Sequence, residues 1–297
     1  MIRLRPDERS FVAAHIHAIC SIALDASKDY LIENRLGGMA AEQGCQSFTE
    51  LFHRVQADTS GVLRRRVINE ITTRETLFFR DSSPFDLLRQ KLLPDLIDRR
   101  ARAGSRTPIR IWSAACSTGQ EVYSIAIVLQ EALGDLSRFN IRIIGTDISD
   151  AAIATASEGV FNGIEIARGL SESALTRYFR PFGAGWKIRD EIRSLATFRR
   201  LNLMEDFSSV GTFDIVFCRN VAIYFNDRDR TSLFSRIGQR MERDGQLIIG
   251  SMESLNNLCP AFESTRHQRC VYYTLKAVGP PPSGALRSSP PAGRGYA

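Results

Sequence analysis

The sequence predicts an α/β protein in which a small helical domain precedes a larger domain built on a mostly parallel β-sheet. Apolar residues recur at helical spacing through the first 70 residues, and from Ile109 onward strand-like runs alternate with helices. This alternation is typical of a parallel sheet covered by helices. With 297 residues, of which 43% are hydrophobic and 24% charged, the chain is long enough for two globular domains.

The helical domain is expected to span residues 1–75. Breaks at Gly37-Gly38, Gly44 and Ser60-Gly61 divide its apolar pattern into short helices. Residues 68–80 are predicted to form a linker, and a further helix follows from Pro84 through Leu96.

The larger domain is expected to span residues 76–276. Ser149 precedes a helical pattern and is predicted to cap it. A further helix follows the turn at residues 115–119 and has Tyr123, Ile127 and Leu133 on its apolar face, and another is predicted at about residues 227–241. Buried strands are predicted at residues 109–115, 140–147, 213–218 and 246–250, with a final candidate at 271–275.

The alternation is interrupted at about residues 175–200. A glycine-containing turn at residues 183–185 and the run at 192–200 predict a helix and short antiparallel strands, inserted into the larger domain. Residues 277–297 are rich in Pro, Gly and Ser with few apolar side chains, so they are predicted to form a disordered tail.

The basic residues leave two interpretations open. The net charge is +6, and 35 of the 39 basic residues are Arg. The cluster Arg64–Arg66 and the group Arg99, Arg100, Arg102, Arg106 and Arg110 could bind an acidic partner, or could be an ordinary solvated surface.

The cysteines and the N-terminal residues argue against several classes of protein. The six Cys residues form no Cys-x-x-Cys pair and only four His accompany them, so we expect buried structural thiols and no metal site. The first residues carry positive charge without an apolar stretch, and no run of about 18 apolar residues occurs. A cytoplasmic protein without membrane insertion is therefore expected.

Polar residues follow the predicted strands at the edge where an open parallel sheet binds its ligands. They are the small-residue turn 115–119, Asp147, the pair Asn202-Leu203 and the run 218–220. A carboxylate such as Asp147 can accept both hydrogen bonds of a ribose diol, but it can equally cap a helix. The turn lacks Gly-x-Gly-x-x-Gly and no P-loop is present, which disfavours a dinucleotide or a triphosphate. An adenosine ligand without phosphates stays open, and S-adenosylmethionine fits that description.

The chain resembles the CheR-type chemotaxis receptor methyltransferases from about residue 10 to residue 276. The longest matching motif is Arg-Ile-Trp-Ser-Ala-Ala-Cys-Ser-Thr-Gly-Gln-Glu-Val-Tyr-Ser at residues 110–124. Further motifs follow the family's order, namely Thr76-x-Phe78-Phe79-Arg80, Gly145-Thr-Asp-Ile-Ser149, Phe198-Arg-Arg-Leu-Asn-Leu203 and Phe213-Asp-Ile-Val-Phe-Cys-Arg-Asn-Val-x-Ile-Tyr-Phe225.

This resemblance implies a Rossmann-like domain that depends on S-adenosylmethionine, carries an inserted antiparallel β-subdomain and follows a small all-α domain. It implies methyl transfer to glutamate carboxylates on the cytoplasmic helical bundle of chemoreceptors, with S-adenosylhomocysteine as the product. Because a glutamate side chain, with an ordinary pKa of about 4.3, is ionised at neutral pH, the reaction needs alignment more than it needs a strong base.

The resemblance also implies roles for single residues. Arg80 and Tyr224 would orient the substrate carboxylate, Glu121 would meet the methionine ammonium group, Asp147 the ribose and Asn202-Leu203 the adenine. The cofactor-binding set it implies is Arg74, Thr76, Arg80, Glu121, Asp147, Asn202, Leu203, Arg219 and Asn220.

Four departures from the family pattern motivate an alternative. Arg74, Ala115, Gln120 and Val122 stand where the family often has Asn, Gly, Glu and Pro, and the added methyl group of Ala115 could crowd the cofactor or strain the backbone. The alternative is therefore a weakly active or inactive relative that serves as a regulatory scaffold.

Partner expectations also follow from the resemblance. Residues 181–188 look too short for the loop with which some relatives bind a receptor pentapeptide, so we expect no such tether. Recognition would instead use the N-terminal domain, where Arg64–Arg66 could face acidic receptor helices. A nucleic-acid methyltransferase is disfavoured, because residues 218–225 lack the Asn/Asp-Pro-Pro-Tyr/Phe run of enzymes that act on base amino groups.

Overall fold

The computed structural model describes residues 2–105 and 107–276, so the predicted disordered tail at 277–297 lies outside the described residues. Its N-terminal part is an all-α domain with a core of its own, in which Ile16, Leu36, Phe48 and Phe52 are completely buried. This confirms the predicted helical domain, but the break predicted at Gly37-Gly38 is wrong, because both glycines lie inside the helix Asp29–Glu42. The helices are α1 (Arg9–Cys20), the 3₁₀ turn η1 (Ala26–Lys28), α2 (Asp29–Glu42), α3 (Phe48–Ala57) and α4 (Val62–Ile71).

The larger domain is built on a seven-stranded sheet with the order β6-β2-β1-β7-β8-β10-β9. The first five strands in this order run parallel, whereas β10 is antiparallel to both of its neighbours. This confirms the predicted α/β class. The strands are β1 (Ile109–Ala114), β2 (Ile141–Asp147), β6 (Ala196–Arg200), β7 (Phe213–Cys218), β8 (Met241–Ile249), β9 (Phe262–His267) and β10 (Cys270–Leu275).

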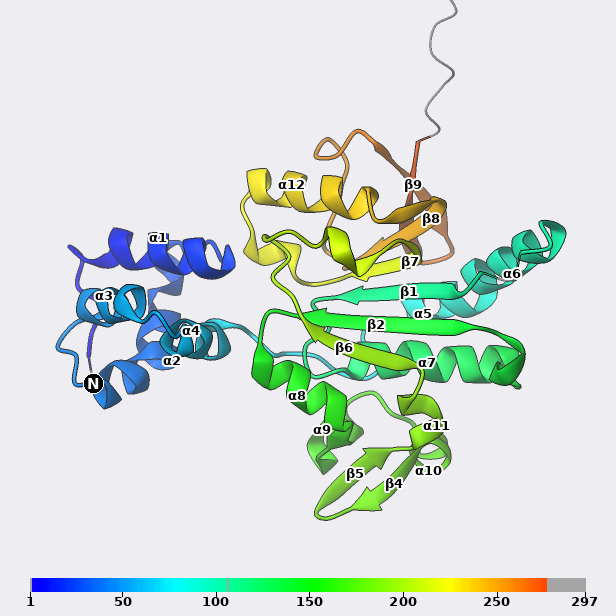
Figure 1. Cartoon of the computed structure of the whole chain (residues 1–297), viewed down its shortest axis with the longest axis horizontal. Helices are drawn as coiled ribbons and strands as arrows, with labels where there is room; N and C mark the ends of the chain where they lie inside the picture. Colours follow the sequence, from blue (N-terminus) through cyan, green and yellow to red (C-terminus); the bar gives the residue numbers. More distant parts are fainter. Residues whose placement is uncertain (1, 106, 277–297) are drawn as a thin grey trace, which may run out of the picture.

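Helices cover the sheet on both faces (Figure 1). One face packs against α7 (Gln120–Leu133) and the segment formed by α5 (Ser83–Leu87), the π-helical turn η2 (Leu88–Leu92) and α6 (Leu93–Arg102). The other face packs against α12 (Asp227–Gly238), whose Leu233, Phe234 and Ile237 are completely buried. Short 3₁₀ turns lie at η3 (Leu136–Arg138), η4 (Ser208–Val210) and η5 (Ala222–Tyr224).

A small antiparallel sheet is inserted after β2 and α8 (Asp150–Glu158), with the strand order β3-β5-β4. It consists of β3 (Val160–Phe161), β4 (Phe179–Phe182) and β5 (Gly185–Ile188), and is accompanied by α9 (Gly163–Ala167), α10 (Glu172–Tyr178) and α11 (Asp190–Arg193).

The prediction that the run 192–200 belongs to this insert is wrong for β6, which pairs in parallel with β2 at the edge of the main sheet. Gly145 on β2 makes this pairing possible, because a Cβ there would lie 2.8 Å from the ring of its partner Phe198. The third strand of the insert is instead β3. Strand β9 was not predicted, because only Phe262 in it is buried and the apolar alternation of a strand is absent.

The helical domain lies at the carboxyl ends of the parallel strands (Figure 1). The Ala23 amide donates to the Tyr224 carbonyl at 2.8 Å, and the Ser149 hydroxyl donates to Oδ1 of Asn69 at 2.7 Å. Nε2 of His17 lies 2.7 Å from a carboxylate oxygen of Asp229. These contacts bring the N-terminal helices against the edge where an open parallel sheet binds ligands. Among the described helices, none is both long and apolar enough to span a lipid bilayer.

Candidate active site

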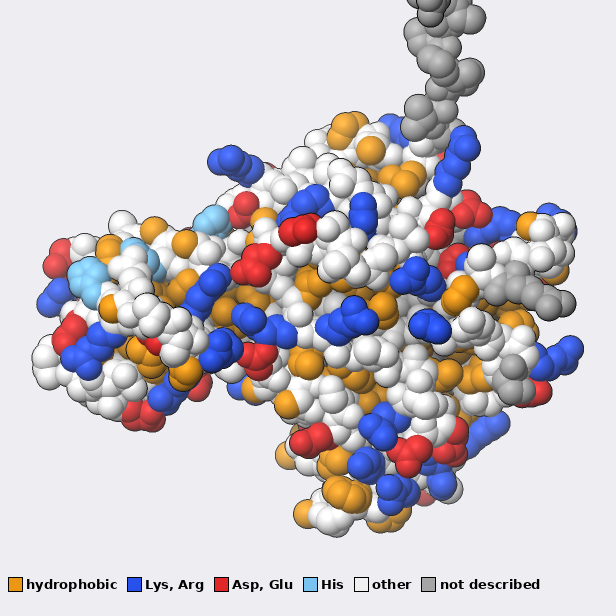
Figure 2. Space-filling view, in the orientation of Figure 1, with side chains coloured by type: hydrophobic (Ala, Val, Ile, Leu, Met, Phe, Trp, Pro, Cys, Tyr) orange, Lys and Arg blue, Asp and Glu red, His pale blue; other side chains and the backbone are white. Residues whose placement is uncertain are grey.

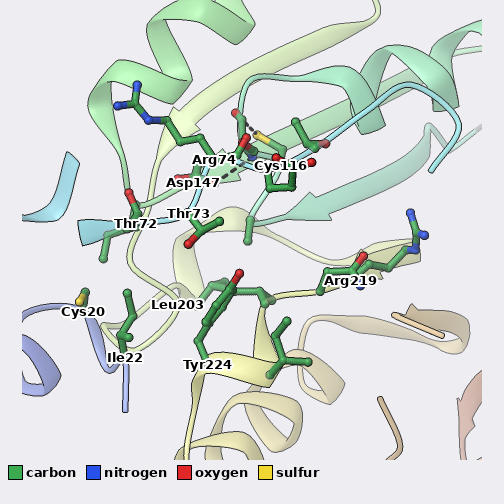
Figure 3. A pocket seen from close by; sticks show the side chains of 18 of the residues that line it. Cys20, Ile22, Thr72, Thr73, Arg74, Cys116, Asp147, Leu203, Arg219 and Tyr224 are labelled. Atoms are coloured by element: carbon green, nitrogen blue, oxygen red, sulfur yellow. Dashed lines mark hydrogen bonds between the residues drawn. The ribbon is translucent and has the colours of Figure 1, made fainter. Parts of the chain in front are cut away.

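A pocket of about 250 Å³ lies at the carboxyl ends of β1, β2 and β7, between the two domains. The structure brings every residue of the predicted site to its lining, although they lie between positions 74 and 224 of the sequence. They are Arg74, Thr76, Arg80, Glu121, Asp147, Asn202, Leu203, Arg219, Asn220 and Tyr224. Figure 3 labels Arg74, Asp147, Leu203, Arg219 and Tyr224 among them.

The turn after β1 forms one wall and contains left-handed residues at Ala115 (φ +62°), Ser117 (φ +50°) and Gly119 (φ +96°). Hydrogen bonds hold it in this conformation: the Cys116 amide donates to the Thr146 carbonyl, and the Ser117 amide donates to the Asp147 carboxylate, both at 2.9 Å. The substitution of Ala at position 115 therefore places an L-residue in a backbone region that favours glycine.

Asp147, at the end of β2, accepts one backbone N–H on each carboxylate oxygen, from Ser117 and Ser149, both at 2.9 Å. Burial raises its pKa, against the opposing effect of these hydrogen bonds. Each oxygen retains a lone pair that could accept a ligand hydroxyl. Asp147 is not the helix cap, because Ser149 caps α8 by accepting from the Ala152 amide.

Arg219 and Glu121 form a second wall and belong to an ionic cluster. Arg219, which follows β7 and is 5% exposed, donates through Nη1 to Oε2 of Glu121 at 2.8 Å and through Nη2 to Oδ2 of Asp81 at 2.9 Å. The same Nη2 donates to the Arg80 carbonyl at 2.8 Å. The other carboxylate oxygen of Glu121, a first-turn residue of α7, accepts from the Ser113 hydroxyl at 2.7 Å. Two carboxylates thus share one guanidinium group.

Arg80 and Tyr224 approach the pocket from different segments. Arg80 is half-buried, and its Nη1 donates to the Glu75 carbonyl at 3.2 Å. Tyr224 ends the η5 turn and is held at its carbonyl by Ala23. In Figure 3 the Tyr224 ring extends into the space that the labelled residues surround.

Arg74 and Asn202 line the pocket in a way that differs from a direct contact with a ligand. Arg74 is exposed, and Figure 3 shows its guanidinium group at the outer edge of the site; its carbonyl accepts from the Ser117 hydroxyl at 3.2 Å. The Asn202 amide nitrogen donates to the Ile19 carbonyl at 3.4 Å and to Glu205 at 3.2 Å. Both residues therefore shape the wall of the pocket.

Sequence reasoning missed several lining residues. Cys20 and Ile22 reach the pocket from the helical domain, and nothing in their local pattern could have indicated this contact. Burial raises the pKa of the Cys20 thiol to about 11, so it stays protonated at neutral pH. The apolar residues Ile148, Leu201 and Val221 could have been found, because each follows a strand end directly or within three positions.

The fold and this site define the class of α/β transferases that bind a nucleoside cofactor at the carboxyl ends of a parallel sheet. Two family models match the chain: the all-alpha domain of the CheR methyltransferases over residues 7–72 and their SAM binding domain over residues 74–271. The chain therefore belongs to the CheR methyltransferase family.

Named relatives agree with this assignment. The chain is 40% identical over 262 residues to chemotaxis protein methyltransferase Cher2 from Pseudomonas putida, covering 86% of this chain and 94% of that protein. It is equally similar to chemotaxis protein methyltransferase 1 from Pseudomonas aeruginosa, at 40% identity and with 86% and 93% covered. Among solved structures, a carbon methyltransferase named DszA matches at 18% identity with a TM-score of 0.37, over 64% of this chain and 37% of that one.

The residues around the pocket fit S-adenosylmethionine. The carboxylates of Glu121 and Asp147 line the pocket, where they could meet the positively charged and hydroxyl groups of such a ligand. Nε of Arg219 is buried without a hydrogen-bond partner among the described residues and is a free donor. Asp147 offers acceptors for a diol, and Leu203 and Ile148 offer apolar surface. No group of three or more His, Cys, Asp or Glu within residues 2–105 and 107–276 could hold a metal ion.

Proposed function

We propose that this protein methylates glutamate side chains on the cytoplasmic helical bundle of chemoreceptors, producing glutamate methyl esters and S-adenosylhomocysteine in the cytoplasm. The observation that carries the proposal is the single pocket to which all ten predicted residues contribute. The family match over residues 74–271 and the names of the relatives support this substrate class.

We infer how the chain holds its cofactor. Asp147 accepts from the ribose hydroxyls, Glu121 binds the ammonium group, and Leu203 with Asn202 borders the adenine. Thr76, Arg219 and Asn220 complete the pocket, and Arg74 contributes through its main chain. When bound, S-adenosylmethionine supplies a methyl group on a positively charged sulfur.

Other residues of the site orient the glutamate carboxylate that accepts the methyl group. A glutamate carboxylate is already ionised at pH 7 and needs no general base. We infer that the Arg80 guanidinium and the Tyr224 hydroxyl hold this carboxylate in line for attack. Alignment with reacting atoms about 3–3.5 Å apart lowers the barrier by several kcal/mol.

We infer that the two domains divide at residue 75, since α4 ends at Ile71 and α5 begins at Ser83. Basic side chains gather over α4 and continue onto the larger domain on the face shown in Figure 2. Arg64 pairs with Glu205 at 3.3 Å and Arg66 pairs with Glu42, so of the predicted cluster Arg65 is the residue not held by a carboxylate in the described part of the chain. This surface is our candidate for contact with acidic receptor helices.

We expect no pentapeptide tether. Gly183 and Ala184 alone connect β4 to β5, which leaves a hairpin without an extended loop. Calorimetry with a receptor C-terminal pentapeptide tests this, and micromolar binding would contradict it.

The experiment that tests the function combines binding with methyl transfer. Calorimetry with S-adenosylmethionine and S-adenosylhomocysteine is expected to show binding, and label from the cofactor is expected to appear as base-labile methyl ester on purified receptor cytoplasmic fragments. Arg80→Ala is expected to reduce transfer by about a hundredfold or more, the cost of a poorly placed group. Arg142→Ala, an exposed residue at the far end of β2, is the matched control. Binding without transfer to any receptor fragment would instead favour the scaffold alternative.

A further inference from the structure

The segment that carries Arg80 is a strained turn held in place from several sides. Phe79 (φ +50°) and Asp81 (φ +61°), its immediate neighbours, both have left-handed backbone conformations. Such conformations are rare for residues with a side chain, and persist where the surroundings determine them. One hydrogen bond within the turn, from the Ser82 amide to the Phe79 carbonyl at 3.0 Å, closes it, and contacts with other segments hold it in place.

Two of these contacts lie on the N-terminal side of Arg80. The Phe79 amide donates to the Ser124 hydroxyl of α7 at 2.9 Å. The Phe78 carbonyl packs so closely on Gly169 that a Cβ there would lie 1.9 Å away, and the Phe78 ring is completely buried. The start of the turn is thus anchored to α7 and to the segment after α9.

The C-terminal side is held by the buried guanidinium of Arg219. Its Nη2 donates both to the Arg80 carbonyl at 2.8 Å and to the Asp81 carboxylate at 2.9 Å. Its Nη1 donates to Glu121, which we have placed at the cofactor's ammonium group. One rigid cation therefore connects the cofactor-facing acid with the residue that we expect to orient the substrate.

We propose that Asp81 is a positioning residue for methyl transfer: its carboxylate fixes Arg219 against the Arg80 carbonyl and so sets the direction of the Arg80 side chain. Asp81 does not line the pocket and is not in the predicted site. Its contribution is therefore to the placement of Arg80 and not to the binding of cofactor.

The proposal predicts a separation of kcat from cofactor affinity. In Asp81→Ala, Arg219 keeps Glu121 but loses the acid that holds its second nitrogen on the turn. We expect kcat to fall by roughly tenfold to a hundredfold, as for other misplaced catalytic groups. The KM for S-adenosylmethionine and the Kd for S-adenosylhomocysteine are expected to stay within about threefold of wild type, because the contacts of Asp147 and Glu121 remain. Asp81→Asn, whose amide oxygen can still accept from Arg219, is expected to restore part of kcat.

A measurement on the ligand-free protein complements the kinetics. Hydrogen exchange of the ligand-free protein is expected to show faster exchange for amides of residues 79–82 in Asp81→Ala than in wild type. Asp190→Ala is the matched control, since it removes an exposed aspartate that pairs with Arg193 at 3.0 Å on α11. That variant is expected to leave kcat, affinity and exchange in the turn unchanged.

Two results would overturn the role of Asp81: an unchanged kcat in Asp81→Ala, or a kcat that falls only in parallel with affinity for S-adenosylhomocysteine. If Asp81→Ala does not fold, Asp81→Asn carries the test, because it removes only the charge on the Arg219 contact: a smaller loss of kcat with unchanged affinity is expected, and an unchanged kcat would overturn the role. The inference rests on the proposed function, so wild type is assayed first. An inactive wild type refutes that function, whereas an active wild type with an equally active Asp81→Ala refutes this inference alone.

Discussion

Removal of the buried cation at position 219 is expected to destabilise the larger domain by a few kcal/mol. The side chain of Arg219 is 1% exposed, and its partners Glu121 and Asp81 are 13% and 37% exposed. Arg219→Met keeps most of the apolar volume but leaves two carboxylates without their counter-ion. Breaking a buried ion pair in this way typically costs about 3–5 kcal/mol.

The expected loss of stability in Arg219→Met can be narrowed from the exposed fractions of the two carboxylates. Asp81 is open enough for water to screen it, so most of the penalty falls on Glu121, and we expect a loss near the lower end, about 3 kcal/mol. At about 2–4 °C per kcal/mol for a chain of this size, Tm would fall by roughly 6–12 °C. Urea unfolding followed by circular dichroism measures the change.

A second variant separates charge from packing. In Arg219→Met combined with Glu121→Gln, the stranded carboxylate is removed, so at least about 1 kcal/mol of the loss is expected to return. A loss below about 1 kcal/mol for Arg219→Met alone, or a double variant that is simply the sum of the two single ones, would refute the reasoning that the cluster is an electrostatic unit.

Three other perturbations have expected outcomes. Asp147→Asn replaces one acceptor by a donor facing a backbone N–H, so affinity for S-adenosylhomocysteine in calorimetry is expected to fall by about tenfold or more, from the loss of about 1.5–3 kcal/mol; unchanged affinity would remove Asp147 from the ribose site. Ala115→Gly relieves a left-handed alanine, and because the gain of about 1–2 kcal/mol is offset by unfolded-chain entropy, the free energy of unfolding is expected to rise by up to about 1 kcal/mol; a clear decrease in denaturant melts would contradict this. Burial alone would raise the pKa of Glu8, but hydrogen bonds from Thr49 and Arg5 hold it below its ordinary value. Glu8 therefore stabilises the folded state above that ordinary pKa, and this contribution is lost as the pH falls through the lower pKa of the folded state. In pH-dependent melts, Glu8→Gln is expected to flatten the decline of stability below about pH 4.3.

Much of the main sheet could be predicted because its strands are buried on both faces. The six residues of β7 are all buried, and all of them except Asp214 are apolar, so this strand can be recognised from the sequence alone. The edge strands β6 and β9 expose most of their side chains, so their pairing depends on partners such as Gly145 and Phe198 that only the fold brings together. The local periodicity of apolar residues does not reveal such partners.

The candidate site was predictable to the extent that its residues follow strand ends. Asp147, Arg219 and Asn220 lie at that edge in any open parallel sheet. The contribution of the helical domain was not predictable, because Cys20 and Ile22 reach the pocket only through a docking whose contacts join distant positions, such as Ala23 to Tyr224.

The carbonyl of Tyr224 is held by the helical domain, whereas the turn of Arg80 is held by Arg219 from within the larger domain. The two groups expected to orient the substrate therefore depend on independent supports, and a perturbation of the domain contact is expected to displace Tyr224 while leaving Arg80 in place.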